Sequence, residues 1–350
     1  MSNFDYKFEQ FKTDKESGIE GYGKTLGKGA YGEVREVKLF NSNKLMAGKL
    51  IKKKNEKVDN EIGIATDVKG NNIIKVVKAL SKQINNEEYE LIIMEKAILR
   101  DLGKLNDFYF KHNLLKVITD PFHEKVGDNL LRFYVKQIVN GLEILDRMYL
   151  VHFDIKPENI LISFNLSAKI SDFSLATKIK DGEKIKIPGG TPGFLSIEYY
   201  ISQDEVTSEV ARKQDYFALG ATIFFIKYGE NLFKFQKYDD REMNANKIVD
   251  ILQIQISKIE SGETTDQEFI NFIKSLIFYT PEQRPNFENI YRNSWLNKNS
   301  EVLEDISASN ENDEEKVIME LQKSDFLLDK KKDINQNLKK FRFKKKINTL

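Results

Sequence analysis

The chain of 350 residues contains no cysteine and only three histidines, His112, His123 and His152. The lack of cysteine excludes disulfide bonds and thiolate metal centres, and it suits a reducing compartment. Three histidines scattered along the chain give little support to a histidine-rich zinc site. The composition therefore argues against a disulfide-stapled scaffold and against a zinc protein.

The chain also lacks a charge imbalance and a long apolar run. Its 55 Lys and Arg residues nearly cancel 54 Asp and Glu residues, so the net charge of +1 provides no general attraction to nucleic acid or to an anionic membrane. The N-terminal segment MSNFDYKFEQFKTDKES has no apolar core of a secretory signal, and no run reaches 18 apolar residues. We therefore expect an intracellular, cytoplasmic protein without nucleic-acid or membrane binding.

The pattern of apolar residues divides the chain into regions. Residues 1–20 are polar and show little pattern, residues 21–95 are rich in short alternating strands, and helical spacing dominates from about residue 97. From residue 298 the composition turns to charge, with seven acidic and no basic residues in 301–315 and six basic residues in 339–346. This predicts an α+β protein with a mostly disordered, charged C-terminal tail.

Three glycines in the segment LGKGAYGEV, namely Gly27, Gly29 and Gly32, are spaced G-x-G-x-x-G. Without a Cβ atom they would let backbone N–H groups approach phosphate oxygens closely. A plain glycine-rich hairpin is the alternative interpretation of this spacing. Val34 continues a strand where a dinucleotide-binding fold needs a helix, which disfavours a Rossmann site.

Lys49 lies among apolar residues in the strand LMAGKLI, 22 residues after Gly27. Most strand lysines are solvated, but these neighbours leave the ammonium group in need of an anion, either a phosphate or a carboxylate. Glu61, 12 residues further on, can supply the carboxylate from the start of a short helix over NEIGIATDV. Glu56 is the rival, and the apolar pattern after Glu61 favours Glu61.

The segment VHFDIKPENILI concentrates polar chemistry in a loop before an apolar strand. Asp154 can accept a hydroxyl proton, Lys156 can neutralise a phosphoryl oxygen and Asn159 can bind a metal ion. Asp172 comes after a predicted hairpin and offers a second oxygen ligand for Mg²⁺. Each side chain alone would fit an ordinary turn, but structural needs alone do not explain the ordered set.

In the order and spacing of these motifs, the chain resembles the eukaryotic protein kinases of the Ser/Thr class, over about residues 22–296. The resemblance implies a two-lobed fold, with a β-rich N-lobe at 21–97 and a larger helical C-lobe at 98–297. It implies transfer of the γ-phosphoryl group of ATP to Ser and Thr hydroxyls of protein substrates, with ATP and Mg²⁺ as cofactors.

The resemblance also implies a role for each matching catalytic side chain. Lys49 would hold the α- and β-phosphates and pair with Glu61. Asp154 would accept the substrate hydroxyl proton. Asn159 and Asp172 would hold Mg²⁺.

Further contacts follow from the same resemblance. Thr191 in GGTPGF would bridge Lys156 and Asp154. Thr191 and Lys156 therefore belong to the implied catalytic residues. Glu198 would pair with Arg284, and Asp215 would brace the backbone of the catalytic loop.

The nucleotide is expected to lie between the glycine loop and a hinge. Met94 would be the gatekeeper residue, and Glu95, Lys96 and Ala97 would form the hinge against adenine. The implied nucleotide contacts are Leu26, Gly27, Lys28, Gly29, Ala30, Gly32, Val34, Ala47, Lys49, Met94, Glu95, Ala97 and Leu161.

Besides Ser196-Ile197-Glu198 in place of A-P-E, two positions depart from the family pattern and matter for regulation. Ser174 replaces the glycine of D-F-G, which restricts the backbone at the start of the activation segment and would hinder an inactive flip. Phe153 stands where many kinases have an arginine that binds a phosphorylated activation-loop residue. Between Lys178 and Gly190 there is no Ser, Thr or Tyr. Since both halves of that switch are missing, we predict a kinase that is not controlled by phosphorylation in mid-loop.

Two other function classes fit parts of this pattern. A pseudokinase that acts as a nucleotide-binding scaffold is the main alternative, and the presence of all five catalytic and metal positions disfavours it. A small-molecule kinase is disfavoured by KPEN and by the complete segment 172–198. The basic tail KKFRFKKK is interpreted as a solvated extension, with docking on the kinase domain, or binding to lipid, calmodulin or nucleic acid, as the alternatives.

Overall fold

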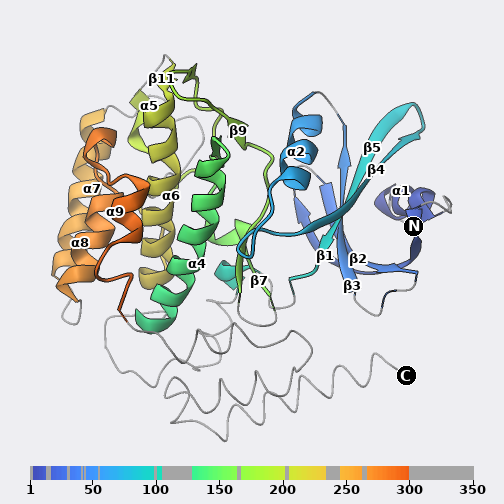
Figure 1. Cartoon of the computed structure of the whole chain (residues 1–350), viewed down its shortest axis with the longest axis horizontal. Helices are drawn as coiled ribbons and strands as arrows, with labels where there is room; N and C mark the ends of the chain where they lie inside the picture. Colours follow the sequence, from blue (N-terminus) through green and yellow to red (C-terminus); the bar gives the residue numbers. More distant parts are fainter. Residues whose placement is uncertain are drawn as a thin grey trace, which may run out of the picture.

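The structure is a computed structural model that describes residues 3–12, 17–29, 32–40, 42, 45–53, 56–97, 101–104, 128–163, 167–201, 205–233, 245–261 and 266–298. These residues form two lobes, one built on an antiparallel sheet and the other mainly helical (Figure 1). The predicted two-lobed α+β fold is confirmed. The exact domain boundaries stay a prediction.

The N-lobe is built on one five-stranded antiparallel sheet with the order β1-β2-β3-β5-β4. The turn between β4 and β5 places Asn85 and Asn86 at φ of 52° and 61°, a conformation that asparagine tolerates in hairpins. The strands are β1 (Ile19–Gly29), β2 (Gly32–Leu39), β3 (Leu45–Lys52), β4 (Val76–Ile84) and β5 (Glu87–Glu95).

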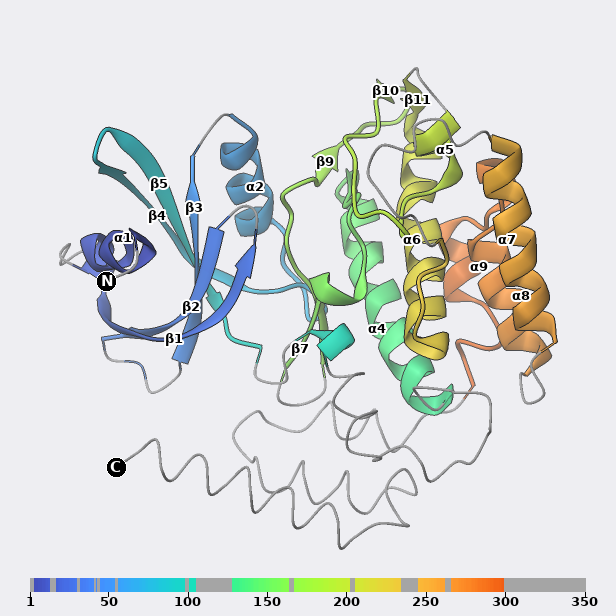
Figure 2. The ribbon, with the colours of Figure 1, turned by 180° about the vertical axis from the view of Figure 1, so that it is seen from behind.

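Two helices cover the opposite faces of this sheet (Figure 2). α2 (Glu56–Asp67) lies on the side that faces the C-lobe, and its buried residues Ile64 and Ala65 join the C-lobe core. α1 (Asn3–Lys12) lies on the other side. The sheet thus separates a face that meets the C-lobe from a face covered by the N-terminal segment.

The N-terminal helix is not foreseen in the sequence analysis, which finds little pattern in residues 1–20. The relevant signal is the spacing of Phe4, Phe8 and Phe11, which lie at positions i, i+4 and i+7 of a helix. Phe8 and Phe11 are almost fully buried against the sheet. Burial of this apolar stripe explains why a largely polar segment forms a helix.

The predicted start of the helix over NEIGIATDV is wrong. α2 begins at Glu56, so Glu61 lies inside the helix and not at its beginning. The apolar pattern marks only the buried part of a helix, and it misses a polar first turn.

The C-lobe is organised around α6 (Ser208–Tyr228), whose residues are buried along most of their length. Thr207 caps the start of α6 by accepting the N–H of Val210, and Gly229 ends it at a φ of 73°. The helices around it are α4 (Asp128–Arg147), α5 (Ile197–Ile201), α7 (Ala245–Glu260), α8 (Gln267–Leu276) and α9 (Phe287–Tyr291), with 3₁₀ turns at Pro157–Asn159 and Pro281–Gln283.

Short strand pairs bring the catalytic segments together between the lobes. β7 (Ile160–Ile162) pairs with β8 (Ala168–Ile170), which confirms the hairpin predicted between Asn159 and Asp172. β6 (Leu150–Val151) pairs with β9 (Thr177–Lys178), and β10 (Lys184–Ile185) pairs with β11 (Val206–Thr207). The activation segment is therefore tied by strand pairs to the catalytic loop and to the entry of α6.

Some sequence predictions fall outside the described residues. Apart from Lys298, the whole predicted tail lies there, as does Ala30 of the glycine loop. Within the described part of the chain, no helix combines the length and apolar character needed to span a membrane.

Candidate active site

Lys49 on β3 lies between two carboxylates. Its Nζ atom is 2.8 Å from Oε1 of Glu61 on α2 and 2.9 Å from Oδ1 of Asp172, which follows β8. Burial alone would lower the pKa of Lys49, but the charges of Asp172 and Glu61 outweigh burial and raise it. The ammonium group is therefore fixed in its charged form, and the predicted Lys49–Glu61 pair is present.

Asp154, Lys156 and Thr191 form a closed hydrogen-bonded triangle. Lys156 Nζ lies 2.7 Å from Asp154 Oδ2 and 2.6 Å from Thr191 Oγ1, and the Thr191 hydroxyl donates to Asp154 Oδ1 at 2.7 Å. Asp154 is 8% exposed. Charge-assisted hydrogen bonds of this kind fix the direction of a carboxylate, which is the requirement for a positioned base.

Asp215 on α6 braces the backbone of the catalytic loop. Its Oδ2 accepts the N–H of His152 at 2.7 Å, and its Oδ1 accepts the N–H of Phe153 at 2.9 Å. Burial raises the pKa of Asp215 to about 7, while the two N–H bonds lower it. These bonds hold Phe153 at a φ of 63°, an unfavourable conformation for a bulky residue.

The His152 ring is a structural group. Its Nδ1 accepts the N–H of Asp154 at 3.3 Å, so the ring proton is on Nε2, which donates to the carbonyl of Ser171 at 3.1 Å. The residue is fully buried, and burial lowers the pKa of His152. A neutral ring with both nitrogens engaged by backbone groups has no free position for acid or base work.

Asn159 and Asp172 offer a donor set that fits Mg²⁺. Asn159 Nδ2 donates to the carbonyl and to Oδ2 of Asp154, at 2.8 and 2.9 Å, which turns its amide oxygen away from Asp154. The Asp172 side chain is 33% exposed, and interaction with Lys49 lowers its pKa against the effect of burial. One carboxylate and one amide oxygen suit Mg²⁺, which keeps waters and substrate phosphates as its other ligands.

No group of three or more His, Asp or Glu side chains within the described residues could hold a metal ion. A site built from Asn159 and Asp172 alone would therefore depend on the bound nucleotide to complete the coordination of Mg²⁺.

The side chain of Ser174, the serine of the D-F-S segment, also lowers the pKa of Asp172. The positive φ of this stretch, 65°, is at Asp172. The observed conformation therefore does not need a glycine at position 174. Sequence reasoning recognised the substitution but missed the effect of Ser174 on Asp172.

The glycine loop joins β1 to β2, with Gly27 opposite Val34 and Gly29 opposite Gly32. A Cβ atom on Gly32 would lie 2.0 Å from the Leu50 carbonyl oxygen, so glycine is required there by packing. A Cβ atom on Gly27 would meet no heavy atom within 4 Å. Packing within the protein thus explains Gly32, whereas the open side of Gly27 is available to a ligand.

The hinge after β5 is tied to both lobes by ion pairs. Lys96 Nζ lies 2.7 Å from Oε1 of Glu36 on β2, and Glu95 Oε1 lies 3.0 Å from Nζ of Lys169 on β8. The Glu95 carboxylate also accepts the N–H of Lys75 at 2.7 Å. The predicted hinge therefore occupies a fixed position at the junction of the lobes.

The other predicted nucleotide contacts lie on strands around this junction. Met94 is opposite Ala47 in the β3–β5 pair, and Val34 is opposite Lys49 in the β2–β3 pair. Leu161 on β7 packs against the C-lobe core. Leu26 on β1 is 36% exposed, and Lys28 pairs with Glu33. Their contact with a nucleotide stays a prediction, as do the individual catalytic roles.

The Phe153 side chain packs beneath the activation segment. It is 1% exposed and forms an apolar cluster with Val151, with Ile179 and Ile187 of the activation segment, and with Ala211 of α6. We call this set the Phe153 cluster. The position that many kinases give to a phosphate-binding arginine is here filled by an apolar contact to the same segment.

The end of the activation segment is held by two further contacts. Arg284 binds Glu198 in a bidentate pair at 2.7 and 3.1 Å, and Arg284 is 2% exposed. A Cβ atom on Gly190 would lie 2.6 Å from the Phe153 carbonyl oxygen, and the φ of Gly190 is 154°. Gly190 therefore permits the close approach of segment and loop, a role the sequence analysis missed although the Gly189–Gly190 pair precedes Thr191.

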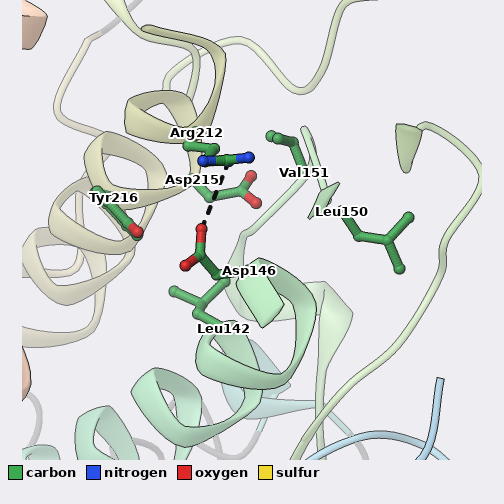
Figure 3. Close-up of a pocket in the computed structure, with 7 residues that line it drawn as sticks. All are labelled: Leu142, Asp146, Leu150, Val151, Arg212, Asp215 and Tyr216. Carbon is green, nitrogen blue, oxygen red and sulfur yellow. Dashed lines mark ion pairs between the residues drawn. The ribbon is translucent and has the colours of Figure 1, made fainter. Parts of the chain in front are cut away.

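A small cavity lies behind the catalytic loop, between α4 and α6 (Figure 3). Its volume is about 10 Å³, room for about one water molecule. Asp215 lines it, together with Asp146 and Arg212, whose Oδ1 and Nε atoms are 3.6 Å apart. The cavity is far too small for a nucleotide, and it lies among the residues that support the catalytic loop.

Comparisons with known proteins agree with this geometry. Residues 21–296 match the protein kinase domain family. Serine/threonine-protein kinase MRCK beta of Rattus norvegicus is 26% identical over 215 residues, 60% of this chain and 12% of that protein. Myosin light chain kinase 3 of Danio rerio is 29% identical over 279 residues, 78% of this chain and 35% of that protein.

A third relative, the probable cell cycle serine/threonine-protein kinase CDC5 homolog of Encephalitozoon cuniculi, is 26% identical over 288 residues, 80% of this chain and 55% of that protein. The chain spans less than two thirds of the length of each of these three relatives. The chain belongs to the protein kinase domain family. Two of these relatives are named serine/threonine-protein kinases, and the third is named a myosin light chain kinase.

Proposed function

We propose that the chain is an Mg·ATP-dependent protein kinase that transfers the γ-phosphoryl group to Ser and Thr hydroxyls of protein substrates. The observation that carries this proposal is the joint arrangement of the Lys49–Glu61–Asp172 contact and the Asp154–Lys156–Thr191 triangle. A scaffold that only keeps the fold has no need of both. The relatives with kinase names support the reaction class.

The chemistry assigns a task to each group. The substrate oxygen attacks the γ-phosphorus, the bond to the bridging oxygen of ADP breaks, and the hydroxyl proton passes to Asp154. Lys156 neutralises charge on the transferred group, and Lys49 holds the other phosphates. Since the protein contributes mainly position and charge, the fixed geometry of these side chains is the source of the rate enhancement.

Asn159 and Asp172 would hold Mg²⁺ in this proposal. When bound, Mg²⁺ would neutralise phosphate charge and orient the transferred group. The chain contributes the orientation of these ligands, because Asp154 fixes the Asn159 amide and Lys49 fixes the Asp172 carboxylate.

The proposed kinase does not depend on phosphorylation in the middle of its activation segment. The Phe153 cluster supports this, since Ile179 and Ile187 are held against the catalytic loop by apolar burial. Burial of apolar surface stabilises the contact without any added charge. The arginine–phosphate switch of other kinases instead needs a modified residue.

The proposed function is tested with protein made in bacteria and a positional peptide library. We expect phosphoryl transfer to peptides with Ser or Thr at the acceptor position, and a loss of about a thousandfold or more in Asp154→Asn. Asp154→Asn keeps the size of the side chain, so it controls for contaminating kinases.

Equal transfer by the wild type and Asp154→Asn would overturn the proposal. Nucleotide binding without transfer would then identify a scaffold of the pseudokinase type. Transfer to Tyr peptides alone would overturn the Ser/Thr assignment.

A further inference from the structure

α1 docks on the face of the N-lobe sheet that is turned away from the nucleotide site. Phe8 and Phe11, 0% and 2% exposed, pack in one apolar cluster with Leu50 of β3. The neighbouring Lys49 points instead to Glu61. Because adjacent strand residues point to opposite faces, α1 cannot touch the nucleotide directly and can act only through the sheet.

Arg35 of β2 connects α1 to the glycine loop. Its guanidinium group binds the carboxylate of Asp5 in α1, and its central carbon lies 4.8 Å from the centre of the Phe8 ring. On its other side, Arg35 Nε is 2.5 Å from Glu33 Oε1. A planar guanidinium group suits this position, because it can stack on a ring and bind two carboxylates at once.

Glu33, the residue after the last loop glycine, is fully buried. It accepts the Thr25 hydroxyl at 3.0 Å and lies 3.2 Å from Lys28 Nζ, and both of these partners are on β1. Burial alone would raise the pKa of Glu33, but Arg35, Lys28 and Thr25 outweigh burial and lower it. An ionised Glu33 thus joins the two strands that carry the glycine-rich turn.

The next residue along β2 faces the nucleotide side. Val34 is opposite Lys49 in the sheet and opposite Gly27 across the turn. A shift of Glu33 must therefore displace Val34 and the turn, which are predicted nucleotide contacts. A continuous set of contacts leads from Asp5 through Arg35 and Glu33 to the glycine loop.

We propose that Asp5, Arg35 and Glu33 act as positioning residues through which the docked helix α1 holds the glycine loop at the spacing that bound ATP requires. This rests on the proposed kinase function. None of the three residues contacts the phosphoryl-transfer groups around Asp154. Loss of the Asp5 link therefore weakens nucleotide binding and raises KM for ATP, while kcat at saturating ATP is kept.

The experiment uses the full chain and the variant Asp5→Asn, with Asp5→Glu as the conservative rescue. Glu20→Gln is the matched control, since it removes a carboxylate that pairs with Lys38 at 2.7 Å on the same β1–β2 ribbon. The dissociation constant of Mg·ATP is measured by calorimetry, and KM for ATP and kcat are measured with a peptide. We expect Asp5→Asn to raise the dissociation constant of Mg·ATP and KM for ATP by about three- to tenfold. Asp5→Glu and Glu20→Gln should match the wild type.

The thermal midpoint of each variant is recorded alongside. A lower midpoint in Asp5→Asn with wild-type ATP affinity and KM would show a purely structural contact and overturn the proposal.

A second variant, Arg35→Met, should raise KM for ATP more than Asp5→Asn does, because it leaves the buried Glu33 carboxylate without Arg35 as its partner. If Arg35→Met does not fold, the result for Asp5→Asn alone tests the proposal. A wild-type chain that binds no nucleotide would overturn the proposed function as well. A working wild type with an unaffected Asp5→Asn would overturn the positioning role alone.

Discussion

The activation segment is held at two places by opposite kinds of chemistry. Near its middle, Ile179 and Ile187 pack on Phe153 in an apolar cluster. At its end, Glu198 forms a buried bidentate ion pair with Arg284. The ion pair depends on both partners being present, because either charge alone would be buried without compensation. The apolar contact has no such requirement and degrades in steps as methyl groups are removed.

Removal of one charge at the end of the segment should have the largest effect. We expect Arg284→Met to lower the free energy of unfolding by about 3–5 kcal/mol, because Glu198 is then left buried and unpaired. Urea denaturation measures this change. The double variant Glu198→Met with Arg284→Met should recover part of the loss, and a single-variant loss below about 1 kcal/mol would contradict the account.

Truncation of the apolar anchor should come next. Phe153→Ala should cost about 3 kcal/mol and reduce turnover, because a buried ring is lost from the contact with Ile187. Phe153→Leu, which keeps much of the volume, should cost about 1 kcal/mol. Equal losses in the two variants would mean that the volume of the side chain does not carry the contact.

The partner on the activation segment allows a more local test. Ile187→Ala should cost about 1–2 kcal/mol, since Ile187 is 8% exposed at the edge of the cluster. It should also make residues 179–189 more sensitive to limited proteolysis. Lys186→Ala is the matched control at an exposed neighbour. Equal cleavage of both variants would show that the cluster does not hold the segment.

The smallest effect is expected at the start of the segment. The Ser174 side chain lowers the pKa of Asp172, so Ser174→Ala should cost about 0.5–1.5 kcal/mol, seen as a higher Mg²⁺ concentration for half-maximal turnover. Ser174→Gly should show the same shift. A normal Mg²⁺ requirement in both variants would remove any role of the Ser174 hydroxyl in the charge state of Asp172.

The Glu198–Arg284 pair and the Phe153 cluster also differ in how well each could be predicted from the sequence. The Glu198–Arg284 pair followed from family motifs, as did the contacts of Lys49 with Glu61 and of Thr191 with Asp154. These are charged groups whose types alone suggest partners. Phe153 gave no such signal, because an apolar side chain can pack on any other and Ile187 lies 34 residues away in the chain.

The N-lobe shows the same limit. The spacing of Phe4, Phe8 and Phe11 predicts helix α1, but the polar residues around them obscure this signal. The burial of Glu33 could not be foreseen, since it depends on α1, Arg35 and two residues of β1 meeting on one face of the sheet. Long-range contacts of this kind are set by tertiary packing, which local pattern does not contain.

The proposed kinase transfers a phosphoryl group to its substrate without a phosphate in the middle of its activation segment. The direct measurement is turnover on a Ser/Thr peptide by bacterially made protein before and after phosphatase treatment, with mass spectrometry of the segment and Asp154→Asn as the blank. We predict the same turnover before and after treatment, far above the blank. Turnover that falls to the blank once phosphate is removed, or that never exceeds it, would contradict the claim.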